Sequence, residues 1–210
     1  MSVKIPLIKK INLEKTLVIG IEGLNGVGKT TLTRNIQNNN ANIKCDLCVP
    51  ELFTKNKEFK SFMLFDAAAT TSALYYLSGI CEAFHVIKNE SYSNVVLDRS
   101  IWSTFAAAYA KRPEFINDIF YAVDALKRHL IIPDKIIVLL ASFETCRQRI
   151  INKNSGKEFD KDTKEIFEKK QEFYRILEDS GYDIHFIDTE TKNPQDVYDE
   201  LKQLEVINLF

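Results

Sequence analysis

The chain has 210 residues, of which 45% are apolar and 27% charged, an ordinary globular composition that excludes general disorder. Its 28 basic and 29 acidic residues give a formal net charge of −1, so no overall field favours nucleic acid or an anionic membrane as a partner. The length is ample for a sizeable core, and we expect residues 1–210 to form a single domain with a small lid.

Cysteine usage and hydropathy indicate a cytoplasmic location. Four cysteines do not make a disulfide scaffold in a chain of this length, which points to a reducing compartment. The longest uncharged run, residues 67–81, is too short to span a bilayer and contains four threonine or serine residues. The first residues alternate between charged and apolar and lack the apolar core of a signal peptide.

Short apolar runs alternate along the chain with longer helical patterns. Five runs read as strands, and several are apolar on both faces, as in a parallel sheet that helices cover on both sides: Leu17–Ile21, Ile43–Val49, Asn94–Asp98, Lys135–Ala141 and Asp183–Asp188. The helical patterns are Lys29–Asn38, roughly Phe59–Asn89, Ile101–Ala110, Pro113–Leu130, Phe143–Ile151, Lys161–Asp179 and Pro194–Leu204. This order predicts an α/β fold, a three-layer αβα sandwich around a central five-stranded parallel sheet.

Local signals mark two helix ends and one loop. Asn193, followed by Pro194, is typical of an N-cap with proline at the first helical position. Gly181 is typical of a helix stop. The polar stretch Asn152–Lys157 predicts a loop, and we place a short lid at about residues 150–160.

Glycine is scarce, 7 of 210 residues or about 3%, which is roughly half its usual share. Four of the seven lie within residues 20–28, directly after the first predicted strand. Residues 23–30 match the phosphate-binding loop (P-loop) pattern Gly-x4-Gly-Lys-[Ser/Thr] and precede a helical pattern. The chain is therefore expected to bind a nucleoside triphosphate.

Each residue type in this loop suits a phosphate. Glycines let backbone N–H groups approach phosphate oxygens at the positive end of the helix that follows. Lys29 supplies a charge for the β- and γ-phosphates, and the Thr30 hydroxyl can ligate Mg²⁺. The residues expected to bind ATP are Gly23, Asn25, Gly26, Val27, Gly28, Lys29, Thr30 and Thr31.

The third predicted strand ends in Asp98-Arg99, at the sheet edge where parallel α/β proteins bind ligands. Asp98 can hold a Mg²⁺-bound water or an acceptor hydroxyl, so Thr30 and Asp98 are the predicted metal residues. Arg99 can clamp the oxygens of a phosphate in transfer with its planar fork. A surface ion pair at the strand end is the alternative interpretation.

Two other classes of P-loop protein fit poorly. A GTPase needs an Asn-Lys-x-Asp motif to read the base, and Asn152-Lys-Asn-Ser155 lacks the acid. A transporter-type ATPase needs Leu-Ser-Gly-Gly-Gln, of which Leu77-Ser-Gly79 is only a fragment, and a strand that ends in Asp-Glu. The pattern favours a kinase.

The chain resembles the thymidylate kinases and the related deoxynucleoside kinases over about residues 16–200. Asp98-Arg-Ser-Ile-Trp-Ser103 is similar both to the Asp-Arg-Tyr-x-x-Ser segment of the first group and to the Glu-Arg-Ser-x-x-Ser segment of the second. Gly23-Leu-Asn-Gly26 resembles the Gly-x-Asp-Gly of thymidylate kinases, and Pro50-Glu51 the Glu-Pro region of both groups. Phe143–Ile150 resembles the approach to their lid.

The resemblance implies the catalytic residues and an acceptor site. Lys29, Asp98, Arg99 and Arg149 would be catalytic, with Arg149 closing over the phosphates. The acceptor would contact Glu51, Phe65, Arg99 and Trp102. The implied activity is transfer of the ATP γ-phosphate to a nucleoside monophosphate such as dTMP, and the implied assembly is a homodimer.

One departure from both groups keeps two alternatives open. They carry an arginine for the acceptor between the second strand and the Asp-Arg motif, but no arginine occurs here between Arg34 and Arg99. Lys55, Lys57 or Lys60 could supply charge but not a two-pronged contact. The alternatives are a deoxynucleoside kinase that phosphorylates a 5′-hydroxyl with Glu51 as base, and a non-catalytic ATP-binding regulatory protein.

Overall fold

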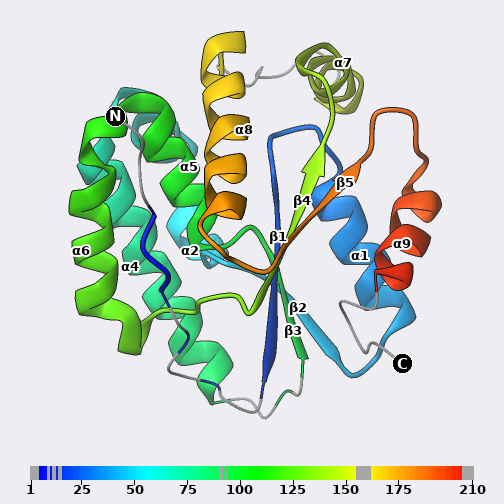
Figure 1. The fold of residues 1–210 in the computed structure, drawn as a ribbon, viewed down its shortest axis with the longest axis horizontal. Coiled ribbons are helices and arrows are strands. Elements are labelled where there is room, and N and C mark those ends of the chain that lie inside the picture. The colour runs from blue at the N-terminus through cyan, green and yellow to red at the C-terminus, as the bar shows by residue number, and fades with distance from the viewer. Residues whose placement is uncertain are drawn as a thin grey trace.

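The computed structural model describes residues 5–8, 10, 13, 16–89, 92, 94–154 and 162–204, except for the side chains of residues 65 and 154. Five strands form one sheet (Figure 1): β1 (Leu17–Gly23), β2 (Ile43–Leu47), β3 (Asn94–Asp98), β4 (Lys135–Leu140) and β5 (Ile184–Asp188). Their order is β2-β3-β1-β4-β5, and every neighbouring pair is parallel. The prediction of a five-stranded parallel sheet is confirmed.

The central strand β1 is buried on both faces because helices cover both sides of the sheet. Successive side chains of a strand point to opposite faces. Val18 accordingly packs into one core cluster, while Ile19 and Ile21 pack into the other, and all three are fully buried. This two-sided burial explains why the sheet strands read as continuous apolar runs.

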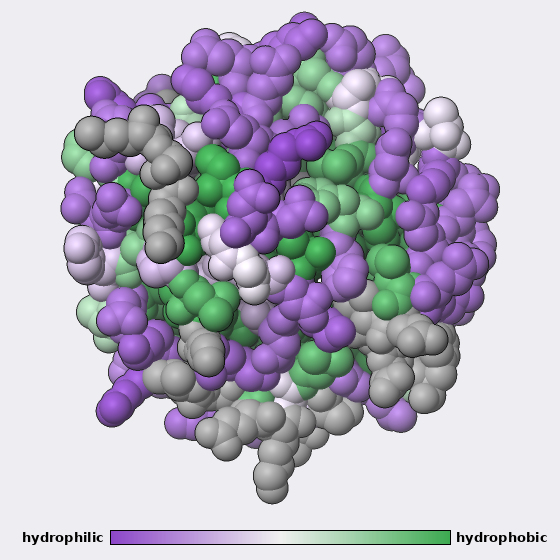
Figure 2. All heavy atoms as spheres, viewed as in Figure 1, coloured by the Kyte–Doolittle hydropathy of each residue, from purple (hydrophilic) through white to green (hydrophobic). Residues whose placement is uncertain are grey.

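The helices form the two outer layers (Figure 1). On one side lie α4 (Ala69–Lys88), α5 (Ile101–Lys111), α6 (Ile116–Leu126) and α8 (Lys164–Asp179); on the other lie α1 (Lys29–Asn39) and α9 (Pro194–Gln203). The helix α7 (Phe143–Asn154) follows β4 at the carboxyl edge of the sheet. In Figure 2 the same view shows hydrophilic residues over most of the surface, with apolar residues confined to small patches between them.

Two predicted helices are divided. The pattern over 59–89 comprises α3 (Lys57–Ser61), the π-helical η1 (Phe62–Asp66) and α4, and a short α2 (Glu51–Thr54) precedes them. Ala67 and Ala68 have extended backbones between η1 and α4, and alanine carries no sequence signal for such a break. The pattern over 113–130 comprises the 3₁₀ turn η2 (Pro113–Phe115), α6 and a second turn η3 (Lys127–His129).

The predicted helix ends are confirmed at two places. Asn193 caps α9 in a reciprocal capping box with Asp196, and Pro194 occupies the first turn. Gly181, with φ of 85°, follows the end of α8. Residues 155–161, most of the expected lid, lie outside the described residues.

The strand order places a ligand site at one edge of the sheet. The chain places β2 and then β3 on one side of β1, and the crossover from β3 then carries β4 to the other side of β1. Such a point leaves a crevice beyond the carboxyl ends of the strands. Within the described part of the chain, no helix is both long enough and apolar enough to cross a bilayer.

Candidate active site

The glycine-rich loop between β1 and α1 lies against the backbone of two other elements. Gly23 has φ of 122°, and a Cβ atom there would lie 2.4 Å from the carbonyl oxygen of Leu139 on β4. Gly26 has φ of 87°, and a Cβ there would lie 2.5 Å from the carbonyl oxygen of Cys146 on α7. Both positions require glycine because a side chain would collide with main chain and strain the backbone.

Lys29, at the first position of α1, is held inside the loop. Its Nζ donates a hydrogen bond of 2.6 Å to the carbonyl oxygen of Leu24, and the residue is 6% exposed. Burial, and next the nearby positive charge of Arg99, hold the pKa of Lys29 well below its ordinary value. An anion entering the loop would relieve both effects, so this lysine is suited to meet one.

Thr30 and Asp98, the two residues predicted to hold a metal, meet at the carboxyl edge of the sheet. The Thr30 hydroxyl donates to a carboxylate oxygen of Asp98 at 2.6 Å, and Asp98 is 8% exposed. Hydroxyl and carboxylate oxygens are hard ligands suited to Mg²⁺, which is bound through few protein groups together with substrate phosphates. Accordingly, the described residues contain no cluster of three or more His, Cys, Asp or Glu that could hold a metal.

Arg99 has an unusual backbone for a residue with a side chain. Its φ is 73°, in the left-handed region, and its N–H donates to the carbonyl oxygen of Ile21 at 2.9 Å. Its guanidinium donates to Oδ1 of Asn25 and, at 3.3 Å, to Oγ of Ser103. The structure thus brings Arg99 to the glycine-rich loop, although the two are more than 70 residues apart in sequence.

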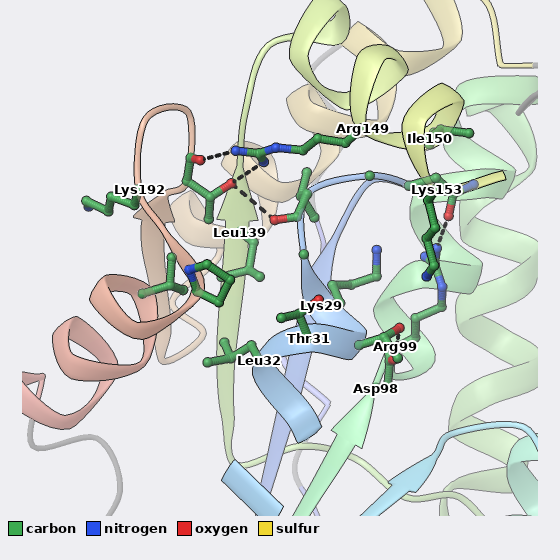
Figure 3. A pocket seen from close by; sticks show the side chains of 18 of the residues that line it. Lys29, Thr31, Leu32, Asp98, Arg99, Leu139, Arg149, Ile150, Lys153 and Lys192 are labelled. Atoms are coloured by element: carbon green, nitrogen blue, oxygen red, sulfur yellow. Dashed lines mark hydrogen bonds between the residues drawn. The ribbon is translucent and has the colours of Figure 1, made fainter. Parts of the chain in front are cut away.

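These residues form one wall of a cavity of about 690 Å³ (Figure 3). All the residues expected to bind ATP line it except Gly23, together with Asp98 and Arg99. The opposite wall comes from α7, the β5–α9 connection and the start of α9, including Lys153, Thr189, Lys192 and Val197. Sequence reasoning predicted only Arg149 in this wall, because a connection that follows a last strand carries no motif.

Arg149 lines the cavity from α7 but points away from the glycine-rich loop (Figure 3). Its guanidinium donates to the hydroxyl and carbonyl oxygens of Thr189 and to the carbonyl oxygen of Glu190. Lys153, one turn further along α7, instead extends toward Arg99 in Figure 3. Of the two α7 cations that line this cavity, Lys153 is therefore the one that points toward Arg99.

Of the four residues expected to contact the acceptor, Arg99 lines this cavity, whereas the other three lie on different elements. Glu51 is exposed on α2, and Phe65 lies in η1. Trp102 is fully buried in α5, with its ring 4.6 Å from that of Tyr182 and 5.4 Å from that of Phe105. Trp102 is thus a core residue in this structure, and neither Glu51 nor Trp102 is among the described residues that line the 690 Å³ cavity.

The four cysteines, all within the described residues, form no disulfide. Burial raises the pKa of Cys45 to about 11 and that of Cys48 well above its ordinary value. Protonated thiols of this kind are poor nucleophiles and poor metal ligands. Cys48 lies in one core cluster and Cys45 packs against the other, so packing accounts for both thiols of the Cys45-x-x-Cys48 pair.

Comparisons with known proteins give one family match and several solved structures with a similar fold. A family model described as thymidylate kinase matches residues 21–201. Thymidylate kinase from Candida albicans has a similar structure, with a TM-score of 0.67, 18% identity and coverage of 90% of this chain and 91% of that one. Deoxyadenosine kinase from M. mycoides has a TM-score of 0.66, 18% identity and coverage of 91% and 100%. None of the curated proteins compared matches the chain significantly.

Proposed function

Because the chain belongs to the thymidylate kinase family and is an ATP-dependent nucleotide kinase, we propose that it moves the γ-phosphate of ATP to a deoxynucleoside monophosphate, with dTMP the first candidate. The observation that carries this proposal is the convergence of Lys29, the Thr30–Asp98 pair and Arg99 on one wall of a cavity. Phosphoryl transfer needs little beyond positioning and charge neutralisation, and these groups supply both.

In this proposal the triphosphate of ATP follows the loop from Gly23 to Thr31. Backbone N–H groups at the start of α1 face the β-phosphate, at the positive end of the helix. The rest of the nucleotide extends between α7 and the β5–α9 connection, toward Thr189 and Val197, which line the same cavity. Lys29 then leaves the Leu24 carbonyl for the β- and γ-phosphates.

ATP binding is expected to take up a proton on Lys29 when the pH lies between the lowered pKa of the free protein and the pKa in the complex. In the ligand-free protein the lysine pKa is lowered, and the negative phosphates raise it in the complex, so between these two values the amine is neutral before binding and charged afterwards. At lower pH the amine is charged in both states and the uptake vanishes. Calorimetry of ATP binding in buffers of different ionisation enthalpy measures this, and Lys29→Met is expected to abolish the pH-dependent uptake.

Mg²⁺ would be held by the Thr30 hydroxyl and Asp98, whose geometry and oxygen chemistry fit it. Bound there, the ion would supply neutralisation of the charge that develops on the phosphates. Replacing Asp98 by Asn removes the negative oxygen ligand, so the Mg²⁺ concentration for half-maximal activity is expected to rise by about 10-fold to 100-fold. Titrating Mg²⁺ at saturating ATP measures it; an unchanged midpoint would remove Asp98 from the metal site.

Arg99 and a cation of α7 would complete the transfer site. The planar guanidinium of Arg99 can contact the transferring phosphate while Asn25 and Ser103 hold it in place. Arg149 would act here only after release from Thr189, whereas Lys153 needs no such change. We therefore propose that Lys153 meets the phosphates first and that Arg149 joins it on closure.

The acceptor would lie beyond Arg99, between Glu51, the segment that begins at Phe65, and α5, with Trp102 supporting that wall from the core. A second candidate function, phosphorylation of a deoxynucleoside 5′-hydroxyl with Glu51 as base, is favoured by one observation. Lys55, Lys57 and Lys60 are all exposed, and no arginine lies between Arg34 and Arg99 to grip an acceptor phosphate.

ADP release measured with each deoxynucleoside monophosphate, with each deoxynucleoside and with unrelated alcohols tests the proposal. Stimulation by monophosphates supports the first candidate, with dTMP expected to give the largest kcat/KM. Stimulation by nucleosides alone would replace it with the second. ATP binding without stimulation by any acceptor would indicate a non-catalytic regulatory protein. Lys29→Ala serves as the control for contaminating activity.

We also propose a cytoplasmic homodimer. Adjacent helices α4 and α6 expose apolar side chains: Leu74 is 54% exposed, Val86 44% and Tyr121 76%. Exposed apolar side chains on neighbouring helices are suited to a contact between subunits. The absence of disulfides among the four cysteines suits a reducing compartment. Light scattering is expected to give about twice the 24.2 kDa mass of one chain.

A further inference from the structure

We propose that Glu22, a buried carboxylate at the end of β1, is a positioning residue that fixes the backbone and the guanidinium of Arg99 for phosphoryl transfer. The inference rests on the proposed function, in which Arg99 contacts the transferring phosphate. Glu22 belongs to neither the phosphate-binding pattern nor the Asp-Arg motif, and it does not line the 690 Å³ cavity.

Glu22 stands where the pattern of β1 calls for an apolar residue. Its strand neighbour Val18 lies on the same face, in the core between the sheet and helices α4, α5, α6 and α8, because residues i and i+4 of a strand share a face. Glu22 is nevertheless fully buried. A buried carboxylate is costly unless hydrogen bonds satisfy it, so its presence in this layer calls for a specific role.

Four donors converge on this carboxylate from two other elements. Oε1 accepts from the Ser100 N–H at 2.7 Å and from the Ser100 hydroxyl at 2.5 Å. Oε2 accepts from the Ser103 hydroxyl at 2.5 Å and from the Tyr174 hydroxyl of α8 at 2.9 Å. Three of the four therefore come from the turn and first helical residues directly after Arg99.

Glu22 acts on Arg99 by two routes. Along the backbone, the N–H of Arg99 donates to the carbonyl oxygen of Ile21, and the N–H of Ser100 donates to Glu22, so β1 holds the two peptide units that flank the left-handed residue Arg99. Along the side chain, the Ser103 hydroxyl accepts from Arg99 and donates to Glu22. The carboxylate thereby fixes the direction in which the guanidinium leaves the strand.

An amide at this position cannot do the same. Glutamine has nearly the same shape as glutamate, but its Nε2 donates hydrogen bonds and cannot accept them. The hydroxyl groups that donate to the carboxylate would have to turn and accept from Nε2 instead. We expect Glu22→Gln to lower kcat by about 10-fold to 100-fold, because a small misplacement of a clamping group has effects of this size. The dissociation constant of ATP is expected to stay within about 2-fold, since the phosphate loop is untouched.

Glu172→Gln provides the matched control. Glu172 lies on α8, as Tyr174 does, and accepts a hydrogen bond of 2.9 Å from the hydroxyl of Tyr109 on α5. None of the hydrogen bonds described joins Glu172 to the turn at Arg99. The kcat of Glu172→Gln should equal that of the unmodified protein.

In the Arg99→Lys background, Glu22→Gln should lower kcat by less than about 2-fold further, because the guanidinium that Glu22 positions is already gone. Two outcomes would overturn the inference. One is a fall in the kcat of Glu22→Gln that is fully explained by a smaller folded fraction. The other is a fall in kcat caused by Glu22→Gln that is as large in the Arg99→Lys background as in the unmodified protein.

A readout that needs no turnover separates this inference from the proposed function. The Arg99 side-chain Nε signal, assigned by its absence in Arg99→Lys, should be one sharp resonance in the unmodified protein and in Glu172→Gln, and should shift or broaden in Glu22→Gln. An unchanged signal in Glu22→Gln would overturn the positioning role even if the protein is an active kinase. A changed signal in a protein that no acceptor stimulates would support it and overturn the proposed function alone.

Discussion

Replacing Lys29 by methionine is expected to lower kcat by about 10³-fold, because it removes the one mobile cation of the phosphate-binding loop from the charge that develops on the β- and γ-phosphates. The methionine side chain is similar in length to that of lysine, and burying it costs less free energy because it carries no charge. It therefore fits the buried position in which Lys29 contacts Leu24. The fold should therefore remain intact. Steady-state kinetics under saturating ATP and acceptor measure the effect, with thermal unfolding as the check on folding.

The control for this substitution is Lys127→Met, on the 3₁₀ turn η3, where the lysine pairs with Asp124 at the surface. A surface ion pair of this kind contributes little, so its loss should leave kcat unchanged. If Lys29→Met retained kcat within about 10-fold, the assignment of the loop as the donor site would be wrong.

Replacing Arg99 by lysine is expected to lower kcat by about 10²-fold while the affinity for ATP changes little. Lysine keeps the charge but has no planar fork, so it cannot contact Asn25, Ser103 and a phosphate together. It also occupies the same left-handed backbone with no new steric cost. Comparison of kcat with the dissociation constant of ATP isolates the transfer step.

Arg112→Lys is the matched control, because Arg112 is exposed and pairs only with Glu114 at 3.3 Å among the contacts described. It should retain full kcat. An Arg99→Lys enzyme with normal kcat, or one that has lost ATP affinity instead, would contradict a role for Arg99 in the transition state.

The parts of the fold that were predicted correctly depend on local pattern. Residues 95–97 and 136–140 are continuous apolar runs, which favour covered parallel strands, and the order of elements then dictates a doubly wound sheet. The break at Ala67-Ala68 could not be predicted, because alanine favours helix and the extended backbone there is set by tertiary packing. The same holds for the division of residues 113–130 into three short elements.

In the candidate site, too, the residues of local motifs could be predicted, whereas roles that depend on contacts in space could not. Lys29 and Thr30 lie in one motif and Asp98 and Arg99 in another, and the parallel sheet brings the two motifs together. Glu22 was not found, because its role depends on Ser100, Ser103 and Tyr174 converging on it in space. The direction of Arg149 toward Thr189 likewise depends on the packing of α7 against a connection without a motif.

The most direct test of the central claim follows the phosphate itself. ATP labelled at its γ-phosphate is incubated with Mg²⁺, the protein, and an equimolar mixture of deoxynucleosides and their monophosphates, and the products are separated. We predict label in a deoxynucleoside diphosphate, foremost dTDP, in amounts equal to the ADP formed. Label found only in deoxynucleoside monophosphates or in inorganic phosphate would contradict a nucleoside monophosphate kinase.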